Sequence, residues 1–332
     1  MVVVPLVVPC RQYSPAPCAP SADCPTAERV GRLTIEPDHT GRCDISTTQR
    51  SFPSSSVLEA FRCPEEPASL PGGQGEAFRC GRIVLKPCRD ADEAAWIAQV
   101  YQDIRQSRFR LPQPVEAIDG SWVVEGWQAW TFVEGSHRRD HWDRVIEVCH
   151  AFHASLKSVT KPAFLDTRDT PFARADRIAW GEESTTFHPR VIPLIERLQS
   201  LLQPVDIPSQ VIHADMTENV LFELGLPPAV IDFSPYWRPA GYAQAIVVMD
   251  ALDWCGAEES ILTLVNDVPC IDQLMIRAEL FRLAILNELN RQGIDELDAI
   301  DGHAGSVAML ERRLGSASPE YDDEETSARS RN

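Results

Sequence analysis

Two short apolar segments with β-branched residues constrain the fold of this chain more than any other feature. Residues 211–222 read Val-Ile-His-Ala-Asp-Met-Thr-Glu-Asn-Val-Leu-Phe, and residues 230–233 read Val-Ile-Asp-Phe. The intervening Glu-Leu-Gly-Leu-Pro-Pro has the glycine and prolines that are typical of a turn. This pattern predicts a strand, a loop and then a hairpin. The hairpin would bring the polar side chains of both segments together at one end.

Three of those polar residues, Asp215, Asn219 and Asp232, are of the types that a phosphoryl-transfer site needs. In such a site a carboxylate orients an acceptor hydroxyl and takes its proton. Two further oxygen ligands hold Mg2+ against the phosphates of ATP. The sequence therefore predicts phosphoryl transfer as the chemistry of this region.

The composition excludes some classes of partner. A chain of 332 residues can bury one large core or two smaller ones. Its net charge of -18 argues against nucleic acid and against an anionic membrane surface, because both bind basic faces. A cationic substrate is compatible with this charge, but acidic soluble proteins are also common.

The ends and the cysteines predict a cytoplasmic protein. Residues 1–9 lack a basic region and contain two prolines, which argues against a signal peptide, and no run approaches the ~18 apolar residues of a membrane helix. The ten cysteines are scattered without a Cys-x-x-Cys pair, which favours reduced thiols. The spacing of four early cysteines fits no structural zinc pattern and predicts free thiols: Cys10, Cys18, Cys24 and Cys43.

Composition also divides the chain into four parts. Residues 1–54 are rich in Pro, Ser, Thr and Cys without periodicity, and we expect a disordered extension. Residues 316–332 form a polar, acidic tail. Between them, residues 55–134 are expected to form a nucleotide-binding lobe and residues 135–315 a helical catalytic lobe.

The first lobe contains short strand-like runs and one helix. Asp90 and Glu93 lie at the start of that helix, and its apolar stripe consists of Trp96, Ile97, Val100, Tyr101 and Ile104. In the second lobe, helical periodicity is expected near 140–157, 189–202, 241–255, 269–291 and 296–314. The fourth of these segments carries two apolar stripes, as in a buried helix. The fold class is therefore α+β, with a small antiparallel sheet, a mainly helical lobe and a cleft between the two.

Possible phosphate-binding residues occur near the start of the first lobe. Gly73 and Gly75 lie in a glycine-rich turn before the first strong strand, where the backbone can approach phosphate closely. Lys86 ends a later strand, as the phosphate-binding lysine of kinases does, and Glu93 on the next helix is its expected ion-pair partner.

Together these residues resemble the aminoglycoside phosphotransferase family, a branch of the protein-kinase-like fold that includes choline and homoserine kinases. The resemblance spans about residues 55–315. Its motifs are His213-Ala214-Asp215, Ile231-Asp232-Phe233 and the hinge phrase Phe132-Val133-Glu134-Gly135. The segment 227–239 is most similar to a poorly characterised, mostly actinobacterial subgroup.

The resemblance implies an ATP-dependent kinase that phosphorylates a hydroxyl of a small molecule, with ATP and Mg2+ as cofactors. Asp215 would be the catalytic base, and Asn219 and Asp232 would bind Mg2+. Lys86 with Glu93 would orient the ATP phosphates, close to Gly73 and Gly75. His213 would brace the loop rather than transfer protons.

The chain departs from the family pattern at three places. Asp215 and Asn219 enclose three residues where kinases have four, so Thr217 or Glu218 is a substitute metal ligand if the loop does not re-form. Ala243 stands where an aspartate usually braces the catalytic loop, and Asp250 is the candidate replacement. Ala214 replaces a glycine, which requires that its φ be negative.

Other readings remain open. The shortened loop and Ala243 also suit a kinase-like regulatory protein that binds nucleotide with little turnover. A protein kinase is less favoured, because no Ala-Pro-Glu anchor follows Asp232. Tyr236, Trp237 and Arg238 are candidates to face the acceptor, and Arg238 would suit an anionic one.

One further pair of residues suggests a metal only weakly. His150 and His153 have helical i, i+3 spacing, but no third ligand is evident nearby. We expect them to be core or surface histidines.

Overall fold

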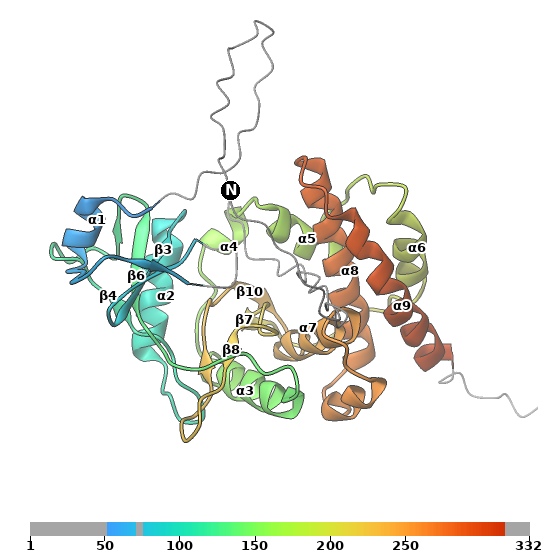
Figure 1. Cartoon of the computed structure of the whole chain (residues 1–332). Helices are drawn as coiled ribbons and strands as arrows, with labels where there is room; N and C mark the ends of the chain where they lie inside the picture. The colour runs from blue at the N-terminus through green and yellow to red at the C-terminus, as the bar shows by residue number, and fades with distance from the viewer. Residues whose placement is uncertain (1–51, 71–75, 316–332) are drawn as a thin grey trace, which may run out of the picture.

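A small lobe built on a sheet precedes a mainly helical lobe (Figure 1). The structure is a computed structural model that describes residues 52–70 and 76–315. The expected tail and most of the expected extension lie outside the described residues. Residues 52–54 are described: the Phe52 ring lies 4.7 Å from that of Phe78, and the Ser54 side chain caps α1, Ser55–Ala60.

The sheet of the first lobe is antiparallel throughout. It has six strands in the order β1-β2-β3-β6-β4, and β5 also pairs with β6. The strands are β1 (Ala68–Ser69), β2 (Phe78–Cys80), β3 (Ile83–Pro87), β4 (Pro114–Val115), β5 (Val123–Val124) and β6 (Trp127–Thr131). The predicted small antiparallel sheet is confirmed.

The two faces of this sheet bury different cores. Side chains alternate along a strand, so Phe78 and Leu85 face a small core that they share with Val57 and Phe61 of the α1 region. The opposite face packs on α2, Ala91–Asp103, where Tyr101 lies 5.5 Å from Trp130 of β6. Because α2 belongs to the large core of the helical lobe, it joins the two lobes.

Helix α2 begins where the sequence predicts a capping residue. The Asp90 carboxylate accepts hydrogen bonds from the backbone N–H groups of Asp92 and Glu93, at 3.0 and 3.1 Å. Of the expected stripe, Val100, Tyr101 and Ile104 are buried, while Trp96 and Ile97 are partly buried against the large core.

The second lobe is built around one buried helix, α8, Ile271–Arg291. Every residue from Leu274 to Leu289 is buried, so the prediction of a buried helix is confirmed. Helices α5, α7 and α9 pack against it. The other helices of this lobe are α3 (Trp142–Ser155), α4 (Phe164–Thr167), α5 (Pro171–Ala179), α6 (Ile192–Ser200), α7 (Ala240–Asp253) and α9 (Ile300–Gly315), with the 3-10 helices η1 (Glu259–Val265) and η2 (Leu297–Ala299).

Burial of α8 has an electrostatic consequence. Glu279, Arg282 and Glu288 are among the residues it buries. A buried charge is costly without a partner, so each of these side chains must meet an opposite charge or a hydrogen-bonding group from a neighbouring helix. One of the resulting clusters, that of Arg282, lies next to the candidate site.

The predicted hairpin is also confirmed. β8, Val220–Leu221, pairs antiparallel with β9, Ala229–Val230, and β7, Gln210–His213, pairs with β10, Pro235–Arg238. None of the helices in the described part of the chain has the length and apolarity needed to span a bilayer.

The expectation that the thiols are reduced is wrong for one pair. Cys63 and Cys80 form a disulfide with a Cα–Cα distance of 5.8 Å, which lies in the usual range for this bond. The fold brings a residue after α1 next to the end of β2, a proximity that the spacing of the cysteines does not reveal. Cys10, Cys18, Cys24 and Cys43 lie outside the described residues, and the cytoplasmic location stays a prediction.

We expect this disulfide to stabilise the first lobe. It closes a loop with a sequence separation of 17 residues, and a loop of this size is worth about 3 kcal/mol through the restricted unfolded chain. The double variant Cys63→Ser/Cys80→Ser should therefore unfold at lower denaturant than the wild type without reductant. Cys270→Ser, which removes an exposed free thiol, is the control. Coincident unfolding curves for wild type and double variant would show that the bond contributes nothing.

Candidate active site

The hairpin brings Asp215, Asn219 and Asp232 to one end. Asp215 follows β7, Asn219 precedes β8 and Asp232 follows β9. The Asn219 side-chain amide donates to the backbone oxygen of Asp215 at 2.6 Å and lies 3.3 Å from its Oδ2. The backbone N–H of Ile231, next to Asp232, donates to the Asn219 carbonyl at 3.0 Å. The short loop thus turns tightly enough to place Asn219 directly against Asp215.

The two substitute ligands considered for a shortened loop are engaged elsewhere. The Thr217 hydroxyl donates to Asp250 Oδ2 at 2.5 Å, and the Glu218 carboxylate forms an ion pair with Arg139. Of the three candidate ligands in this loop, Asn219 is therefore the one whose side chain contacts Asp215. Ala214 also has the negative φ that its side chain requires. The described non-glycine residues with positive φ are Arg62, Glu125, Asp232 and Cys270.

Asp232 has a φ of 52°, in the left-handed region. Aspartate tolerates this conformation better than most residues, and such angles concentrate at functional sites because the surrounding structure must hold them. The angle turns the chain immediately after β9. The Asp232 carboxylate forms an ion pair with the Lys86 ammonium of β3, on the other side of the junction between the lobes.

His213 braces the two loops that carry these residues. Its buried Nδ1 accepts hydrogen bonds from the N–H groups of Asp215 and Ser234, at 3.2 and 3.3 Å, while Nε2 lies 3.1 Å from the carbonyl oxygen of Ile231. Burial lowers the pKa of His213 to about 4, so the imidazole is neutral at pH 7. A neutral ring that accepts at one nitrogen and donates at the other matches this set of partners.

His153 lies behind His213 in the core. Its Nε2 accepts from the backbone N–H of His213 at 2.9 Å, and its Nδ1 lies 2.6 Å from the carbonyl oxygen of Cys149. Burial lowers the pKa of His153 to about 3. His150, by contrast, is exposed, so this pair consists of one core and one surface histidine.

The pKa of Asp215 is strongly perturbed. Burial raises its pKa to about 7, the negative charges of Asp250 and Asp232 add to the rise, and Arg282 opposes it. The side chain keeps 17% of its surface exposed, so a small molecule can reach it. A carboxyl group that changes charge near neutral pH can accept a proton there.

Arg282 and Asp250 form a buried pair behind Asp215. Arg282 Nε donates to Asp250 Oδ1 at 2.7 Å, and its Nη2 donates to Oδ2 at 2.5 Å and lies 3.4 Å from Asp215 Oδ1. Through the Thr217 hydroxyl, Asp250 also holds the loop that follows Asp215. Asp250 thus contacts the loop between Asp215 and Asn219, whereas Ala243, where the resemblance would place an acid, is buried among apolar residues.

Sequence reasoning missed Arg282. The available signal was an arginine in the centre of a helix with apolar residues on two faces. A buried charge of this kind needs an opposite charge or several hydrogen-bond acceptors. The sequence gives no indication that its partner is Asp250 on another helix.

The expected ion pair between Lys86 and Glu93 is replaced by two others. Lys86 pairs with Asp232, and Glu93 Oε1 lies 3.4 Å from Arg168 Nη1. Arg168 is nearly buried, donates to the carbonyl oxygen of Pro235 at 2.8 Å and lies over the Tyr236 ring. Its guanidinium has enough donors to contact α2 and β10 together, which a lysine ammonium on β3 does not do here.

A cavity of about 590 Å³ lies beside the hinge phrase. Its size is within the range of small-molecule sites. The Arg79 guanidinium lies 3.8 Å from the centre of the Phe132 ring, and Arg110 Nη2 donates to the Glu134 carbonyl at 2.8 Å. The lining residues are Arg79, Arg82, Arg110, Phe132, Val133 and Glu134. Gly73 and Gly75, the other expected nucleotide-binding residues, lie outside the described residues.

Arg238 is not available for an anionic acceptor. Its guanidinium is buried and donates to Asp176 Oδ2 at 2.7 Å and to Glu182 Oε1 at 2.6 Å. These two carboxylates satisfy its charge inside the helical lobe. Tyr236 is also buried, and of the three acceptor candidates Trp237 keeps the most exposed position.

Comparisons with known proteins identify the fold. No family model matches the chain, and no curated protein matches it in sequence. A thermostable mutant of aminoglycoside phosphotransferase APH(4)-Ia in a ternary complex with ADP and hygromycin B superposes with a TM-score of 0.51 at 14% identity, covering 80% of this chain and 99% of that chain. The apo form of a thermostable mutant of the same enzyme superposes with a TM-score of 0.50 at 16% identity, with the same coverage of both chains.

A choline/ethanolamine kinase family protein from Mesorhizobium loti gives a TM-score of 0.50 at 15% identity, covering 78% of this chain and 90% of that chain. Identities this low establish shared architecture only. The chain therefore has the two-lobed, protein-kinase-like α+β fold of the aminoglycoside phosphotransferases.

Proposed function

We propose that this chain is an ATP-dependent phosphotransferase that transfers the γ-phosphate to a hydroxyl group of a small molecule. The observation that carries the proposal is the meeting of Asp215, Asn219 and Asp232 with Lys86 at the junction of the two lobes. We further propose that the chain is a member of the aminoglycoside phosphotransferase and choline kinase-like family, in its mostly actinobacterial subgroup.

In this proposal Asp215 is the catalytic base. A carboxylate with a pKa of about 7 takes a proton from an acceptor hydroxyl more readily than an ordinary aspartate, because its affinity for the proton is higher. Its partial exposure admits the hydroxyl, while Arg282 and Asn219 hold its orientation.

Asp232 and Asn219 would hold Mg2+ in this proposal. Both offer oxygen ligands of the kind that Mg2+ prefers, and Asp232 already faces a cation, the ammonium of Lys86. When bound, Mg2+ neutralises charge on the phosphates of ATP. Lys86 would then contact the phosphates, Gly73 and Gly75 would lie beside them, and Glu93 would hold α2 in place through Arg168.

A second function has one observation in its favour. The Arg282 guanidinium lies 3.4 Å from Asp215 Oδ1, and a carboxylate already held by a cation is a weaker base. This arrangement suits a kinase-like regulatory protein that binds nucleotide with little turnover.

ATP consumption by the purified protein distinguishes the two functions. The assay contains Mg2+ and a panel of amino alcohols, aminoglycosides, sugars and amino acids. An acceptor-dependent release of ADP supports the enzyme. Nucleotide binding without turnover of any compound in a broad panel would favour the regulatory protein.

Binding of Mg-ATP should also raise thermal stability. A ligand that binds only the folded state stabilises it by about 2.7 kcal/mol at 100 times its Kd. We expect a clear increase in Tm with millimolar Mg-ATP, a smaller one with ATP and EDTA, and a reduced one in Lys86→Met. An unchanged Tm in a well-folded sample would argue against the site.

A further inference from the structure

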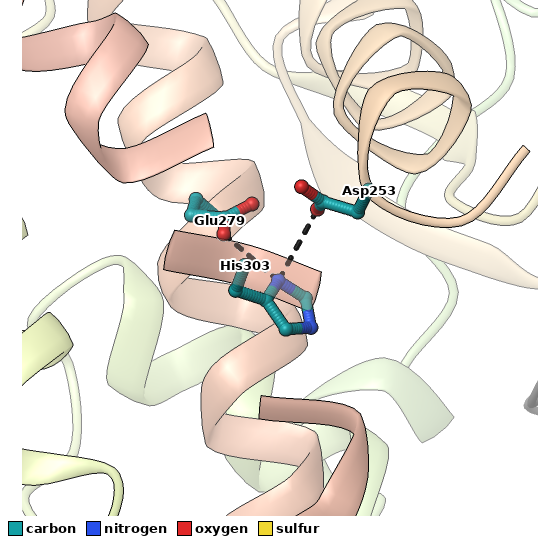
Figure 2. A group of neighbouring side chains, drawn as sticks. All are labelled: Asp253, Glu279 and His303. Atoms are coloured by element: carbon teal, nitrogen blue, oxygen red, sulfur yellow. Dashed lines mark hydrogen bonds and ion pairs between the residues drawn. The ribbon is translucent and has the colours of Figure 1, made fainter. Parts of the chain in front are cut away.

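Three buried ionisable side chains from three helices meet in the helical lobe (Figure 2). Asp253 ends α7, Glu279 lies in the middle of α8, and His303 is in the first turn of α9. His303 Nδ1 lies 2.8 Å from Glu279 Oε1 and 3.2 Å from Asp253 Oδ2. The proposed phosphotransfer reaction uses none of the three.

Two carboxylate oxygens of this cluster, Glu279 Oε2 and Asp253 Oδ2, are buried without a hydrogen bond to any of the described residues. Figure 2 shows the Glu279 oxygen pointing toward the Asp253 carboxylate. Two carboxylate oxygens that face each other inside a protein repel, and each loses its hydration, so a cation or a proton must lie between them.

The surroundings of the cluster orient its members. The Ser306 hydroxyl, one turn along α9 from His303, donates to the other oxygen of Asp253. The Trp254 ring packs edge-on against the imidazole at 5.9 Å. Hydrogen bonds to the outer atoms of ligating carboxylates, together with an apolar shell, are usual around metal sites in proteins.

We propose that Asp253, Glu279 and His303 bind a divalent transition metal of the zinc class. The donor set, one imidazole nitrogen and two carboxylate oxygens, suits this class. Once the metal displaces the proton on Nδ1, the imidazole is neutral and the two carboxylates carry a charge of -2, which one divalent ion neutralises. One ligand atom of each residue lies within 4.8 Å of the others, and a tetrahedron with zinc–ligand bonds of roughly 2.1 Å has edges of roughly 3.4 Å.

The metal would be structural rather than catalytic. The side chains of Asp253 and Glu279 are fully buried and that of His303 is 3% exposed, so a substrate has no access to the ion. The site would connect the end of α7 and the start of α9 to the central helix α8. The same helices carry Asp250 and Arg282, so the ion would also stabilise the support of Asp215.

A proton is the competing occupant. Burial and the Asp253 carboxylate raise the pKa of Glu279 to about 8, and the two carboxylates raise the pKa of His303 to about 10. A proton on Glu279 or on His303 would therefore take the place of the metal. The metal content of the folded protein distinguishes the two occupants, because only the first leaves a bound metal ion.

The test is a zinc titration of the full-length protein after treatment with a chelator. We expect the wild type to bind one equivalent of Zn2+ more than His303→Asn and Glu279→Gln, by calorimetry and by elemental analysis. This comparison by difference cancels zinc held elsewhere in the chain. Asp232→Asn should keep the equivalent, which separates this site from the proposed Mg2+ site. His150→Asn, which removes an exposed histidine of the same lobe, is the matched control.

Substitution with Co2+ provides a second, spectroscopic readout. A tetrahedral site with one nitrogen and oxygen ligands gives visible absorption in the wild type, and Ser306→Ala should weaken Co2+ binding by roughly 10-fold through loss of the hydrogen bond to Asp253. Should the folded wild type bind no more Zn2+ than Glu279→Gln and show no visible band with Co2+, the cluster holds a proton and the proposal is wrong.

Discussion

Asp215→Asn is expected to lower turnover by at least ~100-fold and to leave the affinity for Mg-ATP nearly unchanged. The substitution preserves size and removes the proton acceptor. A general base acts mainly in the transition state, so its loss reduces kcat much more than it reduces binding of the nucleotide. Turnover is measured with the best acceptor from the panel, and nucleotide binding by calorimetry.

Asp232→Asn is the comparison that separates the two carboxylates. A metal ligand acts in the ground-state complex as well, so this variant should lose Mg2+-dependent nucleotide affinity together with turnover. If Asp215→Asn turned over its best acceptor as fast as the wild type, Asp215 would not be the base, and the regulatory function would become the better proposal.

The raised pKa of Asp215 predicts how the activity and the stability of the wild type depend on pH. Because the base must be ionised, kcat/KM of the wild type should fall as the pH decreases below about 7. For stability, the folded pKa lies above the ordinary value, so the protonated form stabilises the fold at low pH. This contribution is lost as the pH rises through about 7. Asp215→Asn should therefore be more stable than the wild type at pH 8.

The second large effect is on stability: Arg282→Met should destabilise the fold by about 3–5 kcal/mol. The side chain of Asp250 is 1% exposed and that of Arg282 is 7% exposed. Removal of the guanidinium leaves the Asp250 carboxylate buried with only Thr217 as a partner, and an uncompensated buried charge costs much more than the ion pair contributes. Urea unfolding of wild type and variant measures the difference.

Two controls isolate the buried charge as the cause. Arg197→Met removes a similar bidentate pair, with Glu311, whose side chains are both 38% exposed, and should cost at most ~1 kcal/mol. The double variant Arg282→Met/Asp250→Asn should recover part of the loss, because no charge remains unpaired. Equal losses in Arg282→Met and Arg197→Met would mean that the pair near Asp215 is no more desolvated than one on the surface.

Local sequence patterns predicted several elements of the fold, although not the helices α1, α4 and α5. Short apolar runs with β-branched residues and a Gly-Leu-Pro-Pro turn predicted the β8–β9 hairpin, and two apolar stripes predicted the buried helix α8. An aspartate before an apolar helical stripe predicted the start of α2. These patterns depend on interactions between residues a few positions apart, which the chain encodes directly.

Partners of the charged side chains depended on the tertiary structure. Lys86 meets Asp232 across 146 positions, Glu93 meets Arg168 across 75, and Arg282 meets Asp250 across 32. The sequence indicates that a buried arginine needs a partner. Which partner it meets depends on how the helices pack.

The sequence likewise gives no indication of the Cys63–Cys80 bond or of the cluster of Asp253, Glu279 and His303. Their members lie on elements that are far apart in the chain and have no characteristic spacing. The sequence by itself determined the loops that carry Asp215, Asn219 and Asp232. Packing of α7 and α8 decided the electrostatic environment of Asp215, because desolvation depends on all the atoms around a charge and not on its neighbours in sequence.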